Sequence, residues 1–350
     1  MTGQIVLWRR GTHRTGFADW PVGARHLMIT VLALVPLAVL TYVLPPFRDY
    51  QLATAAAYLC ATAGLTVLVG VNGQVSLGHG ALMATGAYTV ALLQDAIGVL
   101  VLSVVAGVLV TTAVGAAVGV AAARLRGPYL AGVTLAVTMV VPAVTTLADP
   151  VFHGDQGLPV AVDPPPAALG SLFPPERWQA WLALAAAAVT LFVLANVLHS
   201  RFGRSMRAVR DDEVAAQLAG IHVARTQVLA FVVSAACAGL GGAILALLAQ
   251  SVSPSAFSLT LSLYLLLAVV VGGLGSLPGA VWGALLLVLL PDAITALTGT
   301  LPVDPELAGR LAGNLPLAVF GVTLVVVVLA VPGGLQGLFA RIGRRLRPRS

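Results

Sequence analysis

The chain has 350 residues, of which 59% are hydrophobic and only 9% are charged, and its mean hydropathy is +0.97. This composition excludes a soluble domain, and apolar runs of roughly 20 residues exclude the short alternating strands of an outer-membrane barrel. The net charge of +6 comes from arginines clustered at both ends and in two internal loops, which indicates membrane topology rather than nucleic-acid binding.

We therefore expect an all-α, polytopic integral membrane protein with about eight to ten transmembrane helices. Ten crossings, with both termini inside, satisfy every arginine cluster under the positive-inside rule, and eight or nine remain possible if broken segments do not fully cross. In chain order, the predicted spans are Leu27 to Leu44, Gln51 to Gly70, Leu82 to Leu93, a span from after Asp95 to Arg124, Tyr129 to Leu147, Trp181 to Leu198, Thr226 to Leu248, two from Leu259 to Leu290, and Leu311 to Val331.

The polar stretches divide the chain into regions. Residues 26–335 form the predicted transmembrane domain, between a cytoplasmic N-terminal segment, 1–25, and a basic cytoplasmic tail, 336–350. Pro45 and Pro46 are expected to end the first span. The longest stretch rich in proline and glycine, 149–178, is the predicted external loop, and 199–225 is a predicted cytoplasmic loop.

The charged segment, residues 201–225, is the only dense internal group of charges in the chain. Its three consecutive acids, Asp211, Asp212 and Glu213, are typical of a helix N-cap and first turn, and Gly220 is typical of a helix stop. The pattern predicts a short amphipathic helix from Asp211 to Ala219 on the membrane surface.

Two glycine-rich interruptions resemble each other, LVGVNGQVSLGHGA and VVGGLGSLPGA. Interrupted segments in matching positions indicate a transporter's substrate path. The predicted path residues are Asn72, Gln74, Ser76, His79, Gly272, Gly273 and Gly275. The polar side chains either line a substrate route or satisfy backbone groups where the helix unwinds. For His79 alone, we favour a structural hydrogen bond over proton transfer. For the second break, we favour close helix packing with a kink at Pro278.

Several other functions are excluded or disfavoured. The chain has no lysine, so it has no Walker motif and cannot hydrolyse ATP by that chemistry. A Mg²⁺ site at Asp211, Asp212 and Glu213 would need a second acidic cluster on the same side, and Asp149, Asp155 and Asp163 are predicted on the opposite side. We expect no metal, cofactor or enzyme activity. Asp95 and Asp292 lie at predicted span ends, so ion coupling is also disfavoured, and energy must come from a partner.

Five longer motifs in the chain resemble those of a known protein family. They run from about residue 50 to 335 and are GLTVLVGVNGQVSLGHGALMATGAYTVALL, RLRGPYLAGVTLAV, HGDQGL, RAVRDDEVAAQLAGIHVARTQVLAFVVSAACAGLGGAILA and LYLLLAVVVGGLGSLPGAVWGALLL. The chain resembles LivM-like permease subunits of branched-chain amino acid ABC importers. Urea and short-amide importers share these motifs, and the proline-rich PPPAALGSLFPPERW and Asn72 depart from the usual pattern, so substrate identity stays open.

The resemblance implies a bacterial inner-membrane subunit that works with a second permease, two ATP-binding subunits and an extracytoplasmic binding protein. In such permeases a Glu-Ala-Ala loop docks into the ATPase. The implied coupling residues here are Glu213, Ala215, Ala216 and Gly220, with Val214 inserted; Val214 and Leu218 would supply apolar contact, and Arg207, Arg210, Asp211 and Asp212 the polar rim. An ion-coupled carrier using Asp292 or His79 is the remaining alternative.

Overall fold

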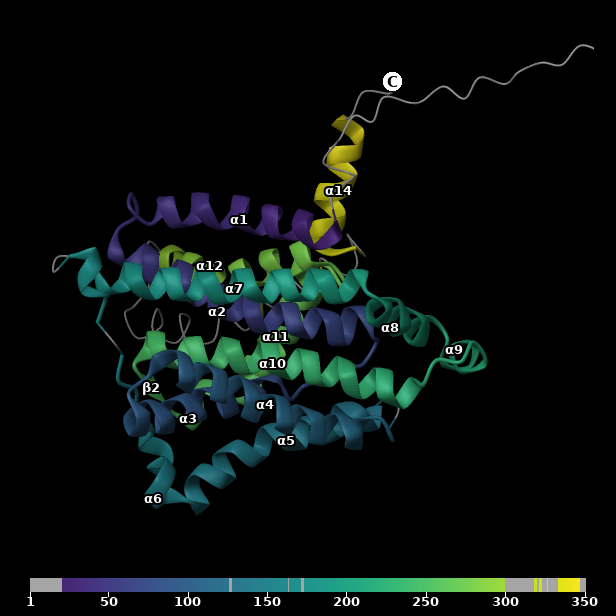
Figure 1. Ribbon diagram of the computed structural model, residues 1–350, viewed down its shortest axis with the longest axis horizontal. Helices are drawn as coiled ribbons and strands as arrows, with labels where there is room; N and C mark the ends of the chain where they lie inside the picture. Colours follow the sequence, from purple (N-terminus) through teal and green to yellow (C-terminus); the bar gives the residue numbers. More distant parts are fainter. Residues whose placement is uncertain are drawn as a thin grey trace, which may run out of the picture.

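A computed structural model describes residues 21–125, 128–162, 164–170, 173–299 and 333–346, with isolated positions between 318 and 326. Its long helices lie side by side in one bundle, and α14 extends away from one end (Figure 1). Within these ranges, eight helices are long and apolar enough to cross a membrane. The predicted all-α, multi-pass membrane architecture is therefore confirmed.

The regular elements have the following bounds. The helices are α1 (Val22–Leu40), α2 (Pro46–Leu65), α3 (His79–Ile97), α4 (Leu100–Ala122), α5 (Pro128–Leu147), α6 (Asp149–Phe152), α7 (Pro175–His199), α8 (Arg201–Asp211), α9 (Glu213–Leu218), α10 (Val223–Ala249), α11 (Leu259–Gly272), α12 (Leu277–Gly299) and α14 (Gly334–Leu346). A π-helical turn, Thr66–Val71, continues α2, and short 3₁₀ turns cover Gly154–Gln156, Ala167–Leu169 and Pro254–Phe257. Strands β1 (Leu158–Pro159) and β2 (Ser251–Val252) pair antiparallel.

Helix α10 forms the centre of the bundle and packs against α2, α3 and α4. Small residues make this close packing possible. A Cβ atom on Gly242 would lie 1.9 Å from the carbonyl oxygen of Met83, and one on Gly86 would lie 2.3 Å from that of Gly239. Lipid tails are as apolar as leucine side chains, so the hydrophobic effect does not drive helices together inside a membrane. Close packing of backbones is therefore a main source of helix association there.

Helix α1 lies at the edge of the bundle against α7, and its surface is mostly exposed (Figure 1). It ends at Leu40, so the predicted role of Pro45 and Pro46 in ending the first span at Leu44 is wrong. Pro46 instead occupies the first turn of α2, where the missing backbone N–H costs no hydrogen bond. The predicted last span, Leu311 to Val331, and residues 1–20 lie outside the described ranges.

Both predicted breaks exist but are shorter than expected. The first is non-helical only between Asn72 and Gly78, and the second only between Gly273 and Ser276. The long apolar run after residue 258 is divided into α11 and α12, as predicted. Pro278 lies in the first turn of α12, where proline fits without kinking the helix, so the predicted kink there is wrong.

The charged segment forms two helices rather than one. The arginine-rich part is α8, whose buried residues Gly203, Met206 and Val209 recur every three positions and face the bundle. Asp211 ends α8, and the N-cap of α9 is Asp212, so the predicted single helix from Asp211 to Ala219 is wrong at its start. The helical spacing of the buried residues between the arginines was the signal that could have revealed α8.

The polar stretch 149–178 contains α6, two 3₁₀ turns and β1, and it ends earlier than predicted because α7 begins at Pro175. Pairing of Leu158 with Val252 joins this stretch to the connection between α10 and α11. It lies at the end of the bundle opposite α8 and α9 (Figure 1).

Candidate functional site

A buried polar cluster lies where the first break ends and α3 begins. His79, the first residue of α3, is fully buried, and its Nε2 lies 2.7 Å from Ser234 Oγ on α10. Its Nδ1 lies 3.3 Å from Ser76 Oγ. Both ring nitrogens therefore have hydroxyl partners, which matches the structural hydrogen bond favoured for His79 from sequence.

Two neighbouring helices supply further hydroxyl groups to this cluster. Thr134 Oγ1 on α5 accepts from the Leu77 N–H at 3.0 Å, and Thr138 Oγ1 donates to the Leu77 carbonyl at 2.8 Å. Ser262 Oγ on α11 accepts from the Gly80 N–H at 2.9 Å. These side chains satisfy backbone groups of the break and of the first turn of α3, which have no partner within a helix. Such groups need a protein partner, because inside a membrane there is no water to bind them.

Sequence reasoning missed Ser234, Thr134, Thr138 and Ser262 as members of the cluster. The two threonines are four residues apart, so they share one face of α5. That spacing of polar residues in an apolar span was the available signal. Ser234 and Ser262 are single hydroxyls in long apolar runs, and no local pattern distinguishes them from ordinary packing residues.

Asn72 and Gln74, also predicted for the path, form a buried pair inside the break. Asn72 Nδ2 donates to Gln74 Oε1 at 2.8 Å. Among the described residues, Asn72 Oδ1 and Gln74 Nε2 have no hydrogen-bond partner although both are buried. Buried amide groups rarely stay unpaired, so this pair has free hydrogen-bonding capacity for water or a polar solute.

The two glycine-rich breaks touch each other. A Cβ atom on Gly70 would lie 2.1 Å from the backbone N of Gly275, so their backbones are in direct contact. Gly275 has a φ of 76°, which favours glycine. Of the other predicted path glycines, Gly272 packs on the backbone of Gly279, and Gly273 has a φ of 129°. The second break therefore contributes close backbone packing, and its place in a substrate path stays a prediction.

Arg210, at the end of α8, lies against both breaks. Its Nη1 donates a hydrogen bond to the carbonyl oxygen of Gly70. A Cβ atom on Gly73 would lie 3.1 Å from Arg210 Cγ, and one on Gly275 would lie 3.7 Å from Arg210 Nη1. One side chain thus joins the surface helix to both interruptions of the bundle.

Helix α9 projects from the end of the bundle (Figure 1). Asp212 Oδ1 accepts from the N–H groups of Val214 and Ala215 at 2.8 and 3.0 Å. At the other end Gly220 has a φ of 81°, and the Ile221 N–H bonds to the Ala216 carbonyl, which is a Schellman stop. Both ends of this six-residue helix are therefore held by local hydrogen bonds.

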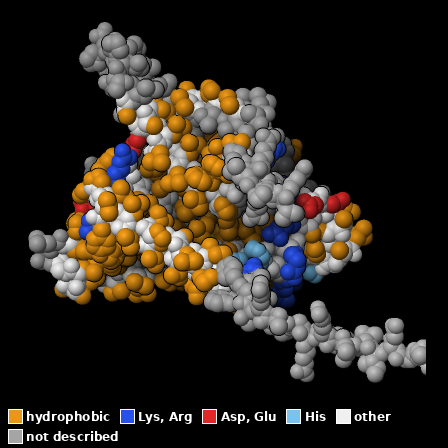
Figure 2. Space-filling view, turned by 90° about the horizontal axis from the view of Figure 1, so that it is seen from above, with side chains coloured by type: hydrophobic (Ala, Val, Ile, Leu, Met, Phe, Trp, Pro, Cys, Tyr) orange, Lys and Arg blue, Asp and Glu red, His pale blue; other side chains and the backbone are white. Residues whose placement is uncertain are grey.

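The outer face of α9 is apolar and exposed. Val214 is 65% exposed and Leu218 is 86% exposed, while Ala216 is buried against Val209 and Val223. Figure 2 shows hydrophobic side chains and acidic side chains together on the projecting lobe at this end. A four-residue spacing places Val214 and Leu218 on one side of the helix, and their role in docking stays a prediction.

The other predicted coupling residues make contacts inside the chain. Arg207 Nη2 donates to the Leu198 carbonyl at 3.1 Å, so it and Arg210 hold α8 to the bundle through carbonyl oxygens. Glu213 Oε1 accepts from Gln227 Nε2 at 3.0 Å. Asp211 is exposed beside α9. Some side chains of the predicted polar rim, Arg207 and Arg210, therefore hold α8 in place through hydrogen bonds within the chain.

Two acidic side chains have partners on neighbouring segments. Asp292 lies two residues before the end of the candidate span Leu277–Ile294, as predicted, and its Oδ2 accepts from Gln51 Nε2 on α2. Sequence reasoning missed Asp49, which is buried in the first turn of α2 with its Oδ2 3.9 Å from Arg177 Nε. In the described ranges, no three His, Cys, Asp or Glu side chains gather where they could hold a metal ion.

A family model and a relative that match this chain both describe permeases of branched-chain amino acid transport. Residues 48–329 match a family model described as the permease component of branched-chain amino acid transport systems. The high-affinity branched-chain amino acid transport system permease protein LivM of Salmonella typhimurium is 33% identical over 257 residues, which cover 66% of this chain and 60% of the relative.

Two more relatives carry related names. LivH of Escherichia coli, a permease protein of the same kind of system, is 31% identical over 154 residues, or 44% of each chain. BraD of Pseudomonas aeruginosa is 25% identical over 260 residues, or 67% of this chain and 81% of the relative. The chain thus spans about 60% of the length of the LivM proteins it matches. No solved structure matches it.

Proposed function

Since the chain belongs to the family of branched-chain amino acid transport system permease components, we propose that it is a permease subunit of an ATP-binding cassette importer. It would form the translocation path for branched-chain or other apolar amino acids, energised by separate ATPase subunits. The observation that carries the proposal is α9: a capped, rigid surface helix with an exposed apolar face, connected through α8 to both broken segments.

The role proposed for α9 is to dock on an ATPase subunit. Val214 and Leu218 would enter an apolar groove of that subunit, as anchors surrounded by the acidic side chains Asp211 and Asp212. The cap at Asp212 and the glycine stop at Gly220 keep α9 helical, so that a movement of the ATPase would displace it as a rigid body.

The proposed transmission runs from α9 to the breaks. Helix α8 follows α7 after Ser200 and meets α9 at Asp212, and Arg210 lies against Gly70 and Gly275. A shift of α8 would therefore change the hydrogen bond at the end of α2 and the contact between the two breaks. A single movement of α8 would therefore act on both breaks.

The proposed path passes the polar cluster of the first break. Asn72 and Gln74 carry the unpaired amide groups, Ser76 contacts the His79 ring, and His79 joins α3 to α10 through Ser234. The described members of this cluster are hydroxyl, amide and imidazole groups. They suit the polar part of a small substrate, but they do not select among substrate side chains. Urea or a short amide is therefore the alternative substrate class, and the binding protein would decide between them.

The proposed partners are those the family resemblance implies: a second permease, two ATP-binding subunits and an extracytoplasmic binding protein, in a bacterial inner membrane. The naming of both LivM and LivH relatives as permease proteins of a transport system supports a second permease partner. The absence of any lysine, and hence of a Walker motif in this chain, supports a separate ATPase.

The test is a reconstituted importer carrying Val214→Asp and Leu218→Asp together. Both side chains are exposed, so folding should be unchanged, while co-purification of the ATPase subunits and ATP-dependent uptake of labelled leucine should be lost. Phe202→Asp, which places a charge on an exposed apolar residue of α8 outside α9, is the control and should keep both signals. Uptake by this chain alone without ATP would disprove the proposal, and uptake competed by urea but not by isoleucine would select the alternative substrate.

A further inference from the structure

An apolar groove lies between the edge helix α1 and the helices α2, α7 and α12. Its volume is about 440 Å³, within the range of roughly 300–1,000 Å³ typical of small-molecule sites. The walls are almost entirely aliphatic, with Ile29, Leu37, Leu184, Ala188 and Val281 among the lining residues. None of the groups assigned to transport above lies in this groove.

The groove has the depth of one leaflet. Eleven residue steps separate His26 from Leu37 on α1, and eleven separate Leu184 from Ala195 on α7, all of them lining residues. At 1.5 Å per residue the groove runs roughly 16 Å along the helices, about half of the ~30 Å hydrocarbon thickness. A transmembrane helix of a partner would need the full thickness, so the dimensions favour a lipid chain.

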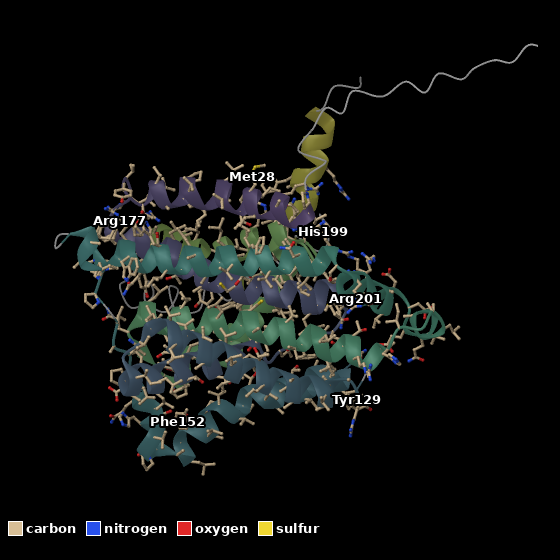
Figure 3. All side chains as sticks on the ribbon, in the orientation of Figure 1. Met28, Tyr129, Phe152, Arg177, His199 and Arg201 are labelled. Carbon is tan, nitrogen blue, oxygen red and sulfur yellow. The ribbon has the colours of Figure 1, made fainter. Side chains whose placement is uncertain are left out.

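The end of the groove near α8 has a basic rim. His26 lines the groove, and its ring lies 4.6 Å from the ring of His199. Arg204 Nη1 donates to the His199 carbonyl at 3.5 Å, which places a guanidinium beside the backbone of His199. Neither α1 nor the stretch 199–210 contains an acidic residue. Figure 3 shows His199 and Arg201 at this end, where α1 begins, and Figure 2 shows histidine and arginine side chains grouped beside a hydrophobic surface.

We propose that this groove binds one anionic glycerophospholipid from the bilayer. An acyl chain would fill the aliphatic groove, and the phosphate would lie on the basic rim formed by His26, His199 and Arg204. Basic pockets between transmembrane helices are suited to anionic headgroups, and each nearby arginine or lysine strengthens the attraction to an anionic surface. The lipid would join α1 to α2 and α12 at the point where α7 leads into α8.

The experiment is native mass spectrometry of the purified full-length chain, titrated with dioleoylphosphatidylglycerol or with dioleoylphosphatidylcholine. We expect one phosphatidylglycerol to bind more tightly than phosphatidylcholine. Arg204→Gln with His199→Gln should weaken phosphatidylglycerol at least about five-fold, because one full charge is lost from the rim. Ala188→Phe, which fills the groove, should remove binding of that lipid.

Matched controls are Arg225→Gln, which removes a charge at the start of α10, and Ala113→Phe, which adds the same bulk on the exposed face of α4. Both should bind phosphatidylglycerol like the parent chain. Equal binding of the two lipids, or full binding after the rim substitutions, would overturn the proposal. His199 and Arg204 are exposed, so the rim variant tests the site even if Ala188→Phe fails to fold.

Discussion

Arg210 on α8 donates a hydrogen bond to the carbonyl oxygen of Gly70, 140 residues earlier in the chain. Gly70 is the second-last residue of the π-helical turn that follows α2, and carbonyl groups at a helix end have no intrahelical partner. The guanidinium therefore replaces part of the helical hydrogen bonding at the point where the first break begins. The same side chain contacts the second break near Gly275.

Arg210→Gln should uncouple transport from ATP hydrolysis. Glutamine is too short to reach the Gly70 carbonyl, so α8 would no longer move the break, and we expect uptake to fall roughly tenfold, which corresponds to a coupling of about 1.4 kcal/mol. ATPase activity of the assembled complex should continue. The measurement is leucine uptake per ATP hydrolysed in proteoliposomes.

Arg201→Gln is the control for this substitution, because Arg201 lies on the same helix with its guanidinium 5.1 Å from the Phe202 ring and away from the breaks. It should keep the parent ratio of uptake to hydrolysis. A parent ratio in the Arg210→Gln variant would mean that this hydrogen bond has no part in coupling.

Gly70→Ala should destabilise the chain. The added Cβ would lie 2.1 Å from the Gly275 nitrogen and 2.6 Å from its Cα, and both neighbours are backbone atoms that cannot rotate away. Overpacking of this kind costs about 1–3 kcal/mol, so the thermal unfolding midpoint in detergent should fall. Gly132→Ala is the comparison, because a Cβ there meets nothing within 4 Å, and its midpoint should not fall.

Ser234→Ala should leave His79 Nε2 buried without a partner. An unsatisfied buried group costs about 1–3 kcal/mol, so the variant should unfold at a lower temperature and α3 should exchange amide hydrogens faster. Ser103→Ala removes an equally buried hydroxyl that bonds only to the carbonyl of Val99 in its own helix, and it should cost much less. Equal losses in the two variants would contradict a special role for the contact between His79 and Ser234.

Gly220→Ala should loosen α9 without unfolding the bundle. At a φ of 81° an alanine side chain costs roughly 1–2 kcal/mol, enough to disturb the Schellman stop of a six-residue helix. Hydrogen exchange at Ala216 and Gln217 should rise, and ATPase co-purification should weaken. Asparagine tolerates this conformation better, so Gly220→Asn should restore part of both signals. Parent-like exchange in the alanine variant would argue against the glycine stop as the source of rigidity.

Local patterns in the sequence were sufficient for much of this protein. Composition and the lengths of the apolar runs determined the all-α membrane class, and the glycine-rich interruptions determined where spans are broken. The acids before Val214 and the glycine after Ala219 determined α9 to within two residues of its start, because caps depend only on neighbours a few positions away.

Contacts between distant segments could be decided only by the tertiary structure. The two breaks look alike in sequence, but nothing there says that Gly70 touches Gly275 or that Arg210 lies on both. His79 finds its partner on Ser234, 155 residues later, because α3 and α10 pack through glycines close enough for the two side chains to meet. Periodicity and capping act within one or two helical turns, whereas these pairings depend on how whole helices pack, and many sequences with the same local patterns would pack differently.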